Sequence, residues 1–332
     1  MDKTYAYAGN EVVGKALEER LSSAGFSLVA DEKEADFILT YFTSSTALED
    51  AYFDERGFVQ SARPGTVLVD LSPATPSFAR ELNAVAVVSE LAVVEAPLVV
   101  ADITVTHAFS DQANLLCFVG GDEAAVDAAE PLIEAVAGSV EKTGAPGSSQ
   151  LVRAAYTIQA TAQVAAAIEA DALYRAVRRS SASYGESGAR VGAMTPQTEL
   201  VLAAVEAGEF EGDYTLEMLM AELSAALMAA DDVDLILPQS EACFHLLELL
   251  AVIGGADKAP AALSLVYGEE SACAENGLDW TRAEQAYGEA EGYGDDDFGA
   301  YGSCDDEGCE GGHGHRHGHG GFPGGIDSYS AN

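Results

Sequence analysis

The first turn of the chain has the spacing of a phosphate-binding loop. Residues 9–14 read GNEVVG, after a short apolar run and before a helical pattern, as in the G-x-G-x-x-G fingerprint of dinucleotide-binding proteins. The middle glycine of that fingerprint lets the backbone approach a pyrophosphate at a helix N-terminus. Glu11 stands there, and two unit charges about 4 Å apart repel by roughly 4 kcal/mol at an effective dielectric constant of 20. We therefore expect the turn to bind a nucleotide about a thousandfold more weakly.

A second candidate for chemistry is a metal-binding tail. Thiolates suit Zn²⁺ and Cu⁺, imidazoles suit Ni²⁺, Cu²⁺ and Zn²⁺, and interleaved glycines would let the chain wrap round an ion. The spacing of the two cysteines is not that of a structural zinc site, which favours an adaptable chelating tail that binds Ni or Zn. The alternative is an acidic solubilising tail whose histidines are unused. The candidate ligands are Cys304, Cys309, His313, His315, His317 and His319.

Composition narrows the class of protein. The 332 residues carry a formal net charge of −39, which opposes binding to nucleic acid or to anionic membranes. No apolar signal segment follows the N-terminus and no run of 18 apolar residues occurs, so we expect a cytoplasmic protein. Cys117, Cys243 and Cys273 lie in apolar segments and are expected to be buried thiols rather than disulfides.

The first part of the chain, residues 1–146, has the pattern of a Rossmann-like α/β domain. Short β-branched runs alternate with helical patterns, as in a parallel sheet with crossover helices. Only five residues separate the run ending at Ala30 from the strand beginning at Asp36. A parallel crossover needs at least ten to twelve residues, so one strand-helix unit is predicted to be shortened or missing. The predicted strands are residues 5–8, 36–41, 66–70, 85–88, 93–96 and 115–120.

The second part is predicted to be helical. Residues 150–179 are rich in alanine, have apolar residues at helical spacing and contain no proline or glycine, which predicts one long connecting helix. Further helical patterns cover residues 196–207, 215–230, 238–253 and 258–265. We place the connecting helix and an all-α domain at residues 147–272. The acidic, glycine- and histidine-rich residues 273–332 are predicted to be a disordered tail.

Several motifs together resemble the β-hydroxyacid dehydrogenase family, which includes 3-hydroxyisobutyrate dehydrogenase and is related to 6-phosphogluconate dehydrogenase. Residues 64–76 with 80–82 resemble its P-G-T-x-x-I-D-x-S-T-x-x-P-x-x-x-R-E-L stretch, and residues 118–123 its V-G-G-D-E motif. Residues 95–97 stand where the family has D-A-P, and residues 147–153 where it has G-x-G-Q-x-x-K. The resemblance covers about residues 4–270. It implies a Rossmann domain, NAD or NADP, a small hydroxyacid substrate and a homodimer through the helical domain.

The resemblance also suggests site residues, and these depart from the family pattern. Arg153 stands at the general acid/base lysine, and arginine does not give up its proton in proteins. Tyr156, one helical turn later, is the alternative proton donor, with Arg153 holding a substrate carboxylate. The structural alternative is a packed Tyr156 and a salt-bridged surface Arg153. Gly9, Gly14, Phe42 and Thr43 are the predicted cofactor-binding residues.

Two functions therefore stay open from the sequence. The first is an NAD(P)-dependent oxidoreductase that acts on a small hydroxyacid. The second is a non-catalytic protein on the same fold, which binds a small ligand or a partner and carries a metal-chelating tail. The missing strand-helix unit would carry the residue that selects NAD or NADP, so the choice between the two nucleotides is not predicted.

Overall fold

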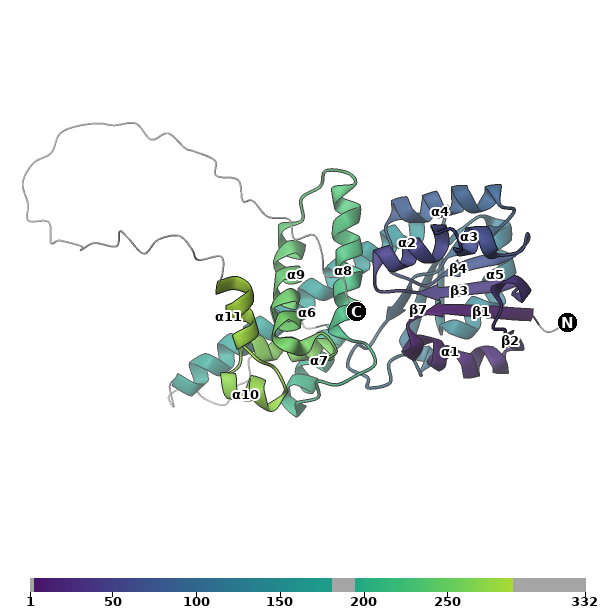
Figure 1. The fold of residues 1–332 in the computed structure, drawn as a ribbon. Coiled ribbons are helices and arrows are strands. Elements are labelled where there is room, and N and C mark those ends of the chain that lie inside the picture. The colour runs from purple at the N-terminus through teal and green to yellow at the C-terminus, as the bar shows by residue number, and fades with distance from the viewer. Residues whose placement is uncertain (1–2, 181–194, 289–332) are drawn as a thin grey trace, which may run out of the picture. The chain divides into compact units, whose positions relative to one another are not determined.

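The computed structural model describes residues 3–180 and 195–288. Eight strands form one sheet in the order β2-β1-β3-β4-β5-β7-β6, with β8 paired to β7. As predicted, a Rossmann-like sheet is followed by a long helix and a helical region (Figure 1). The strands are β1 (Lys3–Gly9), β2 (Phe26–Leu28), β3 (Phe37–Tyr41), β4 (Val67–Asp70), β5 (Ala92–Glu95), β6 (Leu98–Val100), β7 (Leu115–Gly121) and β8 (Ser139–Gly144).

Alternate residues of the sheet pack against helices on its two faces. Ile38, Leu68 and Val93 belong to the cluster that includes the side chains of α2 and α4, whereas the next residues, such as Leu39 and Val69, pack with α1. Burial on both faces explains why these strands are continuous apolar runs rather than alternating ones. The helices are α1 (Glu11–Ser23), α2 (Ser45–Phe53), α3 (Phe58–Ser61), α4 (Pro76–Val88) and α5 (Glu123–Val136), with 3₁₀ turns at η1 (Glu32–Glu34) and η2 (Gln112–Asn114).

The short connection before β3 is possible because β2 has only three residues. β2 and β3 lie on opposite sides of β1, and both pair with Tyr5 near its start. The chain therefore crosses β1 without returning along a full strand, and the single turn η1 is enough. The minimum of about ten to twelve residues for a connection between parallel strands applies to strands of ordinary length. The loss of a family strand-helix unit at this point stays a prediction.

One strand prediction was wrong, and three strands, β2, β6 and β8, were missed. Residues 85–88 form the last turn of α4, because the amphipathic pattern that begins at Pro76 outweighs the β-branched preference of the valines. β6 continues β5 after a break at Ala96 and Pro97, and both pair antiparallel with β7 in one continuous register. The sheet is therefore mixed rather than wholly parallel.

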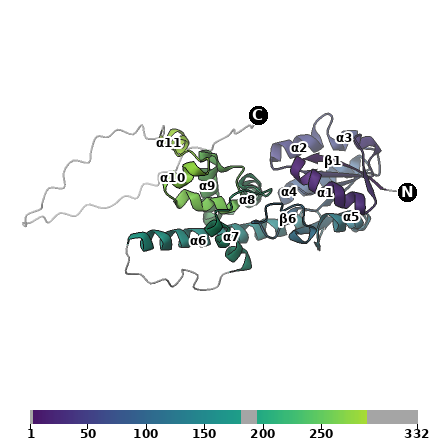
Figure 2. The ribbon, with the colours of Figure 1, turned by 90° about the horizontal axis from the view of Figure 1, so that it is seen from below.

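The helical half follows the prediction closely up to residue 250. The long helix α6 (Ser148–Ser180) contacts β7 and β8 at one end and α7, α8 and α9 further along (Figure 2). No single helix among the described residues is long and apolar enough to cross a membrane, although one pair of segments bent by 87° satisfies length and composition together. The remaining elements are α7 (Pro196–Ala207), α8 (Leu216–Asp231), α9 (Pro238–Leu250), a π-helical turn η3 (Ala251–Gly255), a 3₁₀ segment η4 (Pro260–Tyr267), α10 (Glu270–Glu275) and α11 (Thr281–Gly288).

The disordered tail was predicted to begin at residue 273, which is too early in the chain. Cys273 is fully buried in α10, Leu278 is buried, and the Trp280 indole Nε1 donates to Cys273 Sγ at 3.1 Å. Three apolar side chains thus fix residues 273–288, whose acidic character concealed them. Residues 289–332, with all six candidate metal ligands, lie outside the described residues.

Candidate active site

The residue at the family lysine position is buried inside the protein. Arg153, on the second turn of α6, is 1% exposed, and its Nη2 lies 3.1 Å from Glu222 Oε2 of α8. Thr157, one turn later on α6, donates to the same oxygen at 3.4 Å. Burial raises the pKa of the Glu222 carboxyl, and the Arg153 charge opposes that rise. Arg153 is therefore salt-bridged, as one alternative held, but it is not at the surface.

Aromatic side chains enclose this ion pair. Tyr41 at the end of β3 stacks edge-on against Phe109, and Phe109 contacts Tyr214, with ring centroids 6.1 and 6.4 Å apart. Tyr214 also hydrogen-bonds to Glu222. Burial raises the pKa of both tyrosines. All three rings are almost completely buried, so they separate the Arg153 guanidinium from solvent.

Tyr156 and Glu222 both line a very small cavity. The cavity has a volume of about 20 Å³ and is also lined by Thr161, Tyr214 and Glu222. This volume holds about one water molecule. The Tyr156 ring packs against Phe118 of β7 at 6.3 Å, and burial raises the pKa of its hydroxyl. The structure thus places Arg153 and Tyr156 around one carboxylate, with no room for a hydroxyacid in this cavity.

In the phosphate-binding turn, hydrogen bonds within the chain use the backbone donors. The Asn10 side chain caps α1 and accepts from the amides of Val12 and Val13, at 2.9 and 3.2 Å. The Asn10 amide donates to Tyr41 O, and the Gly14 amide donates to Asn10 O. Amides at a helix N-terminus are the groups that hold a pyrophosphate. An asparagine directly before a helical pattern is an N-cap signal. The sequence therefore already indicated that Asn10 caps this helix.

The two glycines of the turn have structural reasons for being glycine. Gly9 has φ +122°, and a Cβ there would lie 2.0 Å from Tyr41 O. A Cβ on Gly14 would lie 2.5 Å from the Tyr7 ring, which occupies the space beside the turn. The glycine spacing is therefore accounted for by contacts to β3 and Tyr7, without a bound nucleotide.

Glu11 does not project into the turn as the repulsion argument assumed. Its side chain is 85% exposed and pairs with Lys15 at 3.2 Å on the surface of α1. Water and salt screen an exposed charge, so the expected repulsion of roughly 4 kcal/mol was too large.

Phe42 and Thr43, the other two predicted cofactor-binding residues, are half-buried beyond β3. The Phe42 amide donates to Ser72 Oγ at 3.0 Å.

Residues of the family motifs connect α6 to the sheet. Glu95, at the D-A-P position, is 2% exposed and accepts a hydrogen bond from the Ser149 amide at 3.1 Å. A Cβ on Gly120 would lie 2.4 Å from Glu95 Oε1, so a larger residue at this position of V-G-G-D-E would displace the Glu95 carboxylate. Gln150 accepts from the Ala74 amide and donates to Ser72 O, at 3.1 and 3.0 Å.

Comparisons with known proteins support the relationship. The family model for the NAD binding domain of 6-phosphogluconate dehydrogenase matches residues 5–144. The NAD-dependent L-serine dehydrogenase of Pseudomonas aeruginosa is 26% identical over 253 residues, which cover 72% of this chain and 82% of that protein. The chain is similar to the β-hydroxyacid dehydrogenases.

Two solved structures show that this β-hydroxyacid dehydrogenase fold extends into the helical half. The 3-hydroxyisobutyrate dehydrogenase of Salmonella typhimurium has a TM-score of 0.63 at 17% identity, over 80% of this chain and 100% of that one. Psf3, solved in complex with NADP⁺ and 2-OPP, has a TM-score of 0.64 at 17% identity, over 79% and 99%. NAD or NADP is thus the nucleotide supported for a domain of this type. The catalytic roles predicted for Arg153 and Tyr156 stay predictions.

Proposed function

We propose that this chain binds a small ligand or a partner, is built on the β-hydroxyacid dehydrogenase fold and does not oxidise hydroxyacids. The observation that carries the proposal is the buried Arg153–Glu222 pair. A substrate carboxylate would have to displace Glu222 from Arg153 in a dry interior, and a buried charge left without its partner is strongly unfavourable. The cavity beside Tyr156, about 20 Å³ in volume, is too small for a substrate.

The phosphate-binding turn fits a dinucleotide poorly. Four amide donors of residues 10–14 already have acceptors within the chain, and a pyrophosphate would have to compete with the Asn10 cap. Tyr7 fills the space beside Gly14. We therefore infer weak binding of NAD or NADP.

The second candidate function is a dehydrogenase in which Tyr156 is the proton donor. One observation favours it: Tyr156 lines the cavity, and a tyrosine hydroxyl, whose ordinary pKa is about 10, has a proton to donate at neutral pH. The nucleotide, when bound, would supply the hydride. For this function the Tyr41, Phe109 and Tyr214 rings would have to move aside, so that a carboxylate reaches Arg153.

The test is a titration of metal-free protein with NADH and NADPH, followed by nucleotide fluorescence and thermal stability. We expect no saturation below millimolar nucleotide, and no turnover of 3-hydroxyisobutyrate or L-serine. Micromolar binding with turnover that is lost in Tyr156→Phe would establish the dehydrogenase instead. Micromolar binding without turnover would leave a nucleotide-binding protein that is not an enzyme for these substrates.

Three further properties are proposals without support from the described residues. The first is that Cys304, Cys309 and the histidines of the tail bind Ni or Zn. Among residues 3–180 and 195–288, no group of three or more potential metal ligands occurs. A homodimer through the helical half is the second, and a cytoplasmic location is the third.

A further inference from the structure

A second and larger cavity lies in the helical half, away from Arg153. It has a volume of about 310 Å³, which is within the lower range of small-molecule sites. Its walls come from the last turns of α6, the end of α7, and the segment from η4 to α10. Nothing in the dehydrogenase motifs points to it, because those motifs end near the start of α6.

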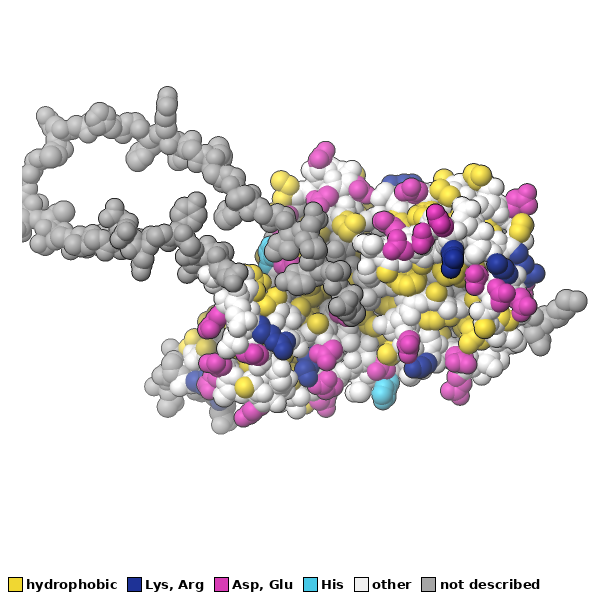
Figure 3. Space-filling view, viewed as in Figure 1, with side chains coloured by type: hydrophobic (Ala, Val, Ile, Leu, Met, Phe, Trp, Pro, Cys, Tyr) yellow, Lys and Arg dark blue, Asp and Glu magenta, His cyan; other side chains and the backbone are white. Residues whose placement is uncertain are grey.

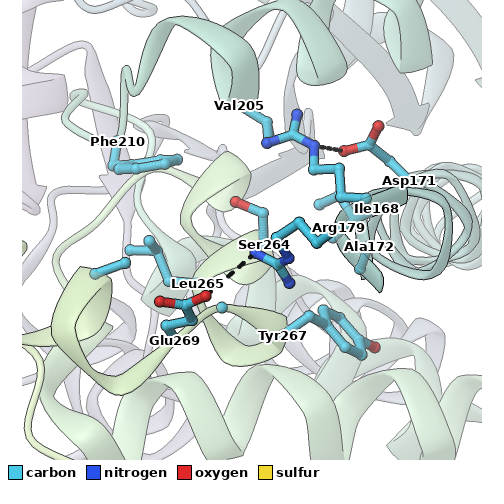
Figure 4. A pocket seen from close by; sticks show the side chains of 13 residues that line it. Ile168, Asp171, Ala172, Arg179, Val205, Phe210, Ser264, Leu265, Tyr267 and Glu269 are labelled. Carbon is cyan, nitrogen blue, oxygen red and sulfur yellow. Dashed lines mark ion pairs between the residues drawn. The ribbon is translucent and has the colours of Figure 1, made fainter. Parts of the chain in front are cut away.

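Two ion pairs line this cavity. Arg175 Nε lies 2.6 Å from Asp171 Oδ2, and Arg179 Nη1 lies 3.7 Å from Glu269 Oε1. The second pair is long and exposed, with 58% of Arg179 and 71% of Glu269 accessible. An exposed pair of this length contributes little to stability and opens at little cost. Figure 4 marks both pairs with dashed lines, and the Arg179–Glu269 pair joins α6 to the segment between η4 and α10.

The rest of the lining is largely apolar. Phe210 and Leu265 belong to it, and Leu265 lies beside Glu269 (Figure 4). Ile168 and Val205 complete the apolar lining, and all four side chains are more than nine-tenths buried. A ligand would therefore meet charges of both signs together with buried hydrocarbon.

The balance of charge is unusual for this chain. Acidic side chains are spread over the face shown in Figure 3, in keeping with the net charge of −39. In the cavity, by contrast, two arginines face two carboxylates. Each arginine is already paired with a carboxylate. A ligand that separates the exposed Arg179–Glu269 pair must offer a group of opposite sign to each member, which a zwitterion does and a single anion or cation does not.

We propose that this cavity binds a free α-amino acid with an apolar side chain. The ammonium and carboxylate groups of an amino acid share one carbon atom, so both can reach the members of a pair whose atoms are 3.7 Å apart. The carboxylate pairs with Arg179 and the ammonium group with Glu269. The side chain then covers Phe210 and Leu265. The proposal does not depend on nucleotide binding or on catalysis.

If the arginines only stabilised the C-terminal end of α6, substitution of Arg178 and substitution of Arg179 should have the same effect. Cations at the C-terminal end of a helix interact favourably with its dipole, and Arg178 and Arg179 both lie in the last turn of α6. Arg178, however, lies over the Tyr174 ring at 5.8 Å and does not line the cavity. It therefore supplies a matched control on the same turn.

The experiment is calorimetric titration of the full chain with L-leucine. We expect saturable binding that weakens about tenfold or more in Arg179→Gln and in Glu269→Gln, with no change in Arg178→Gln. Leucinamide and N-acetyl-L-leucine, which each lack one charge, should bind about tenfold more weakly, and glycine should not bind measurably. Circular dichroism of each variant verifies the fold.

Three results would overturn the proposal. The first is no heat of binding with leucine or phenylalanine at tens of millimolar. The second is an equal effect of Arg178→Gln and Arg179→Gln, which would indicate helix stabilisation alone. The third is N-acetyl-L-leucine binding as tightly as leucine, which would make the site one for monoanions.

Discussion

Arg153 Nη2 and Glu222 Oε2 lie 3.1 Å apart in the interior, on two different helices. At the position where the related dehydrogenases have a lysine, this chain thus has a cation whose carboxylate partner is supplied by its own α8. The Tyr41, Phe109 and Tyr214 rings beside the pair are themselves almost completely buried. The energetic role of the pair can be measured directly.

Removing Glu222 should be far more damaging than removing both members of the pair. Glu222→Gln leaves the Arg153 charge buried without compensation, and we expect a loss of about 3–5 kcal/mol in the free energy of unfolding. The double variant Arg153→Met, Glu222→Leu should lose less than Arg153→Met or Glu222→Leu alone. Urea denaturation of the wild type, these two single variants and the double variant provides the double-mutant cycle.

The exposed pair Lys15–Glu11 is the matched control for that cycle. Its side chains are 75% and 85% accessible, so Lys15→Gln should change stability by less than about 1 kcal/mol. Additive effects of the Arg153 and Glu222 substitutions would contradict the assignment of a coupled buried pair.

Asp70 should make the protein less stable as the pH rises. Burial raises the pKa of its carboxyl from 3.8 to about 6, although Oδ1 accepts hydrogen bonds from Thr40 Oγ1 and the Ser72 amide. Between these two pKa values the folded state binds more protons than the unfolded state. The stabilising contribution is therefore complete below about pH 4 and is lost as the pH rises through about 6.

Asp70→Asn should remove this dependence, because an amide oxygen can accept the same hydrogen bonds without a charge. We expect the variant to be more stable than the wild type by roughly 1–3 kcal/mol at pH 8 and equally stable at pH 4. The measurement is the difference between the two unfolding free energies at several pH values, which cancels the titration of Glu95 and Glu222. An advantage that grows toward low pH would show that the sign is wrong.

Gly120→Ala should weaken the start of α6. The added Cβ would lie 2.4 Å from Glu95 Oε1 and 2.6 Å from Ser149 Oγ, and so would displace the carboxylate that caps the helix. We expect a loss of about 1–3 kcal/mol, within the range for lost caps and overpacking. Gly288→Ala, where no atom lies within 4 Å of the new Cβ, is the control. Equal melting temperatures for the two variants would refute this explanation.

Asn10→Gly should improve nucleotide binding if the cap is what occupies the amides. The change frees the Val12 and Val13 amides and costs only a few tenths of a kcal/mol in capping. We expect the Kd for NADH to fall about tenfold, since a hydrogen bond to a charged group contributes about 1.5–3 kcal/mol. Glu11→Gln should have a smaller effect because that side chain is exposed. An unchanged Kd in Asn10→Gly would mean that another feature, such as Tyr7, limits binding.

The sequence predicted the periodic elements well and the site poorly, for one physical reason. Helix α6 and helix α7 have strong local patterns, and the predicted and observed ranges agree closely. Whether Arg153 is exposed depends instead on Glu222, Tyr41 and Tyr214, which come from distant parts of the chain. A local pattern contains no information about such partners. The order of residues 273–288 was missed in the same way, since it depends on a few apolar side chains in an acidic background.

The first turn of α6 also determines whether the helical half can rotate relative to the sheet. Three hydrogen bonds tie Ser149 and Gln150 to Glu95, Ser72 and Ala74 of the sheet and its loops. A hinge at this turn would break all three in a buried environment, so a closing rotation of the kind that many enzymes use has no easy pivot here. Access to Arg153 must instead come from rotation of individual rings, and a ligand that reaches it would enter slowly and leave slowly.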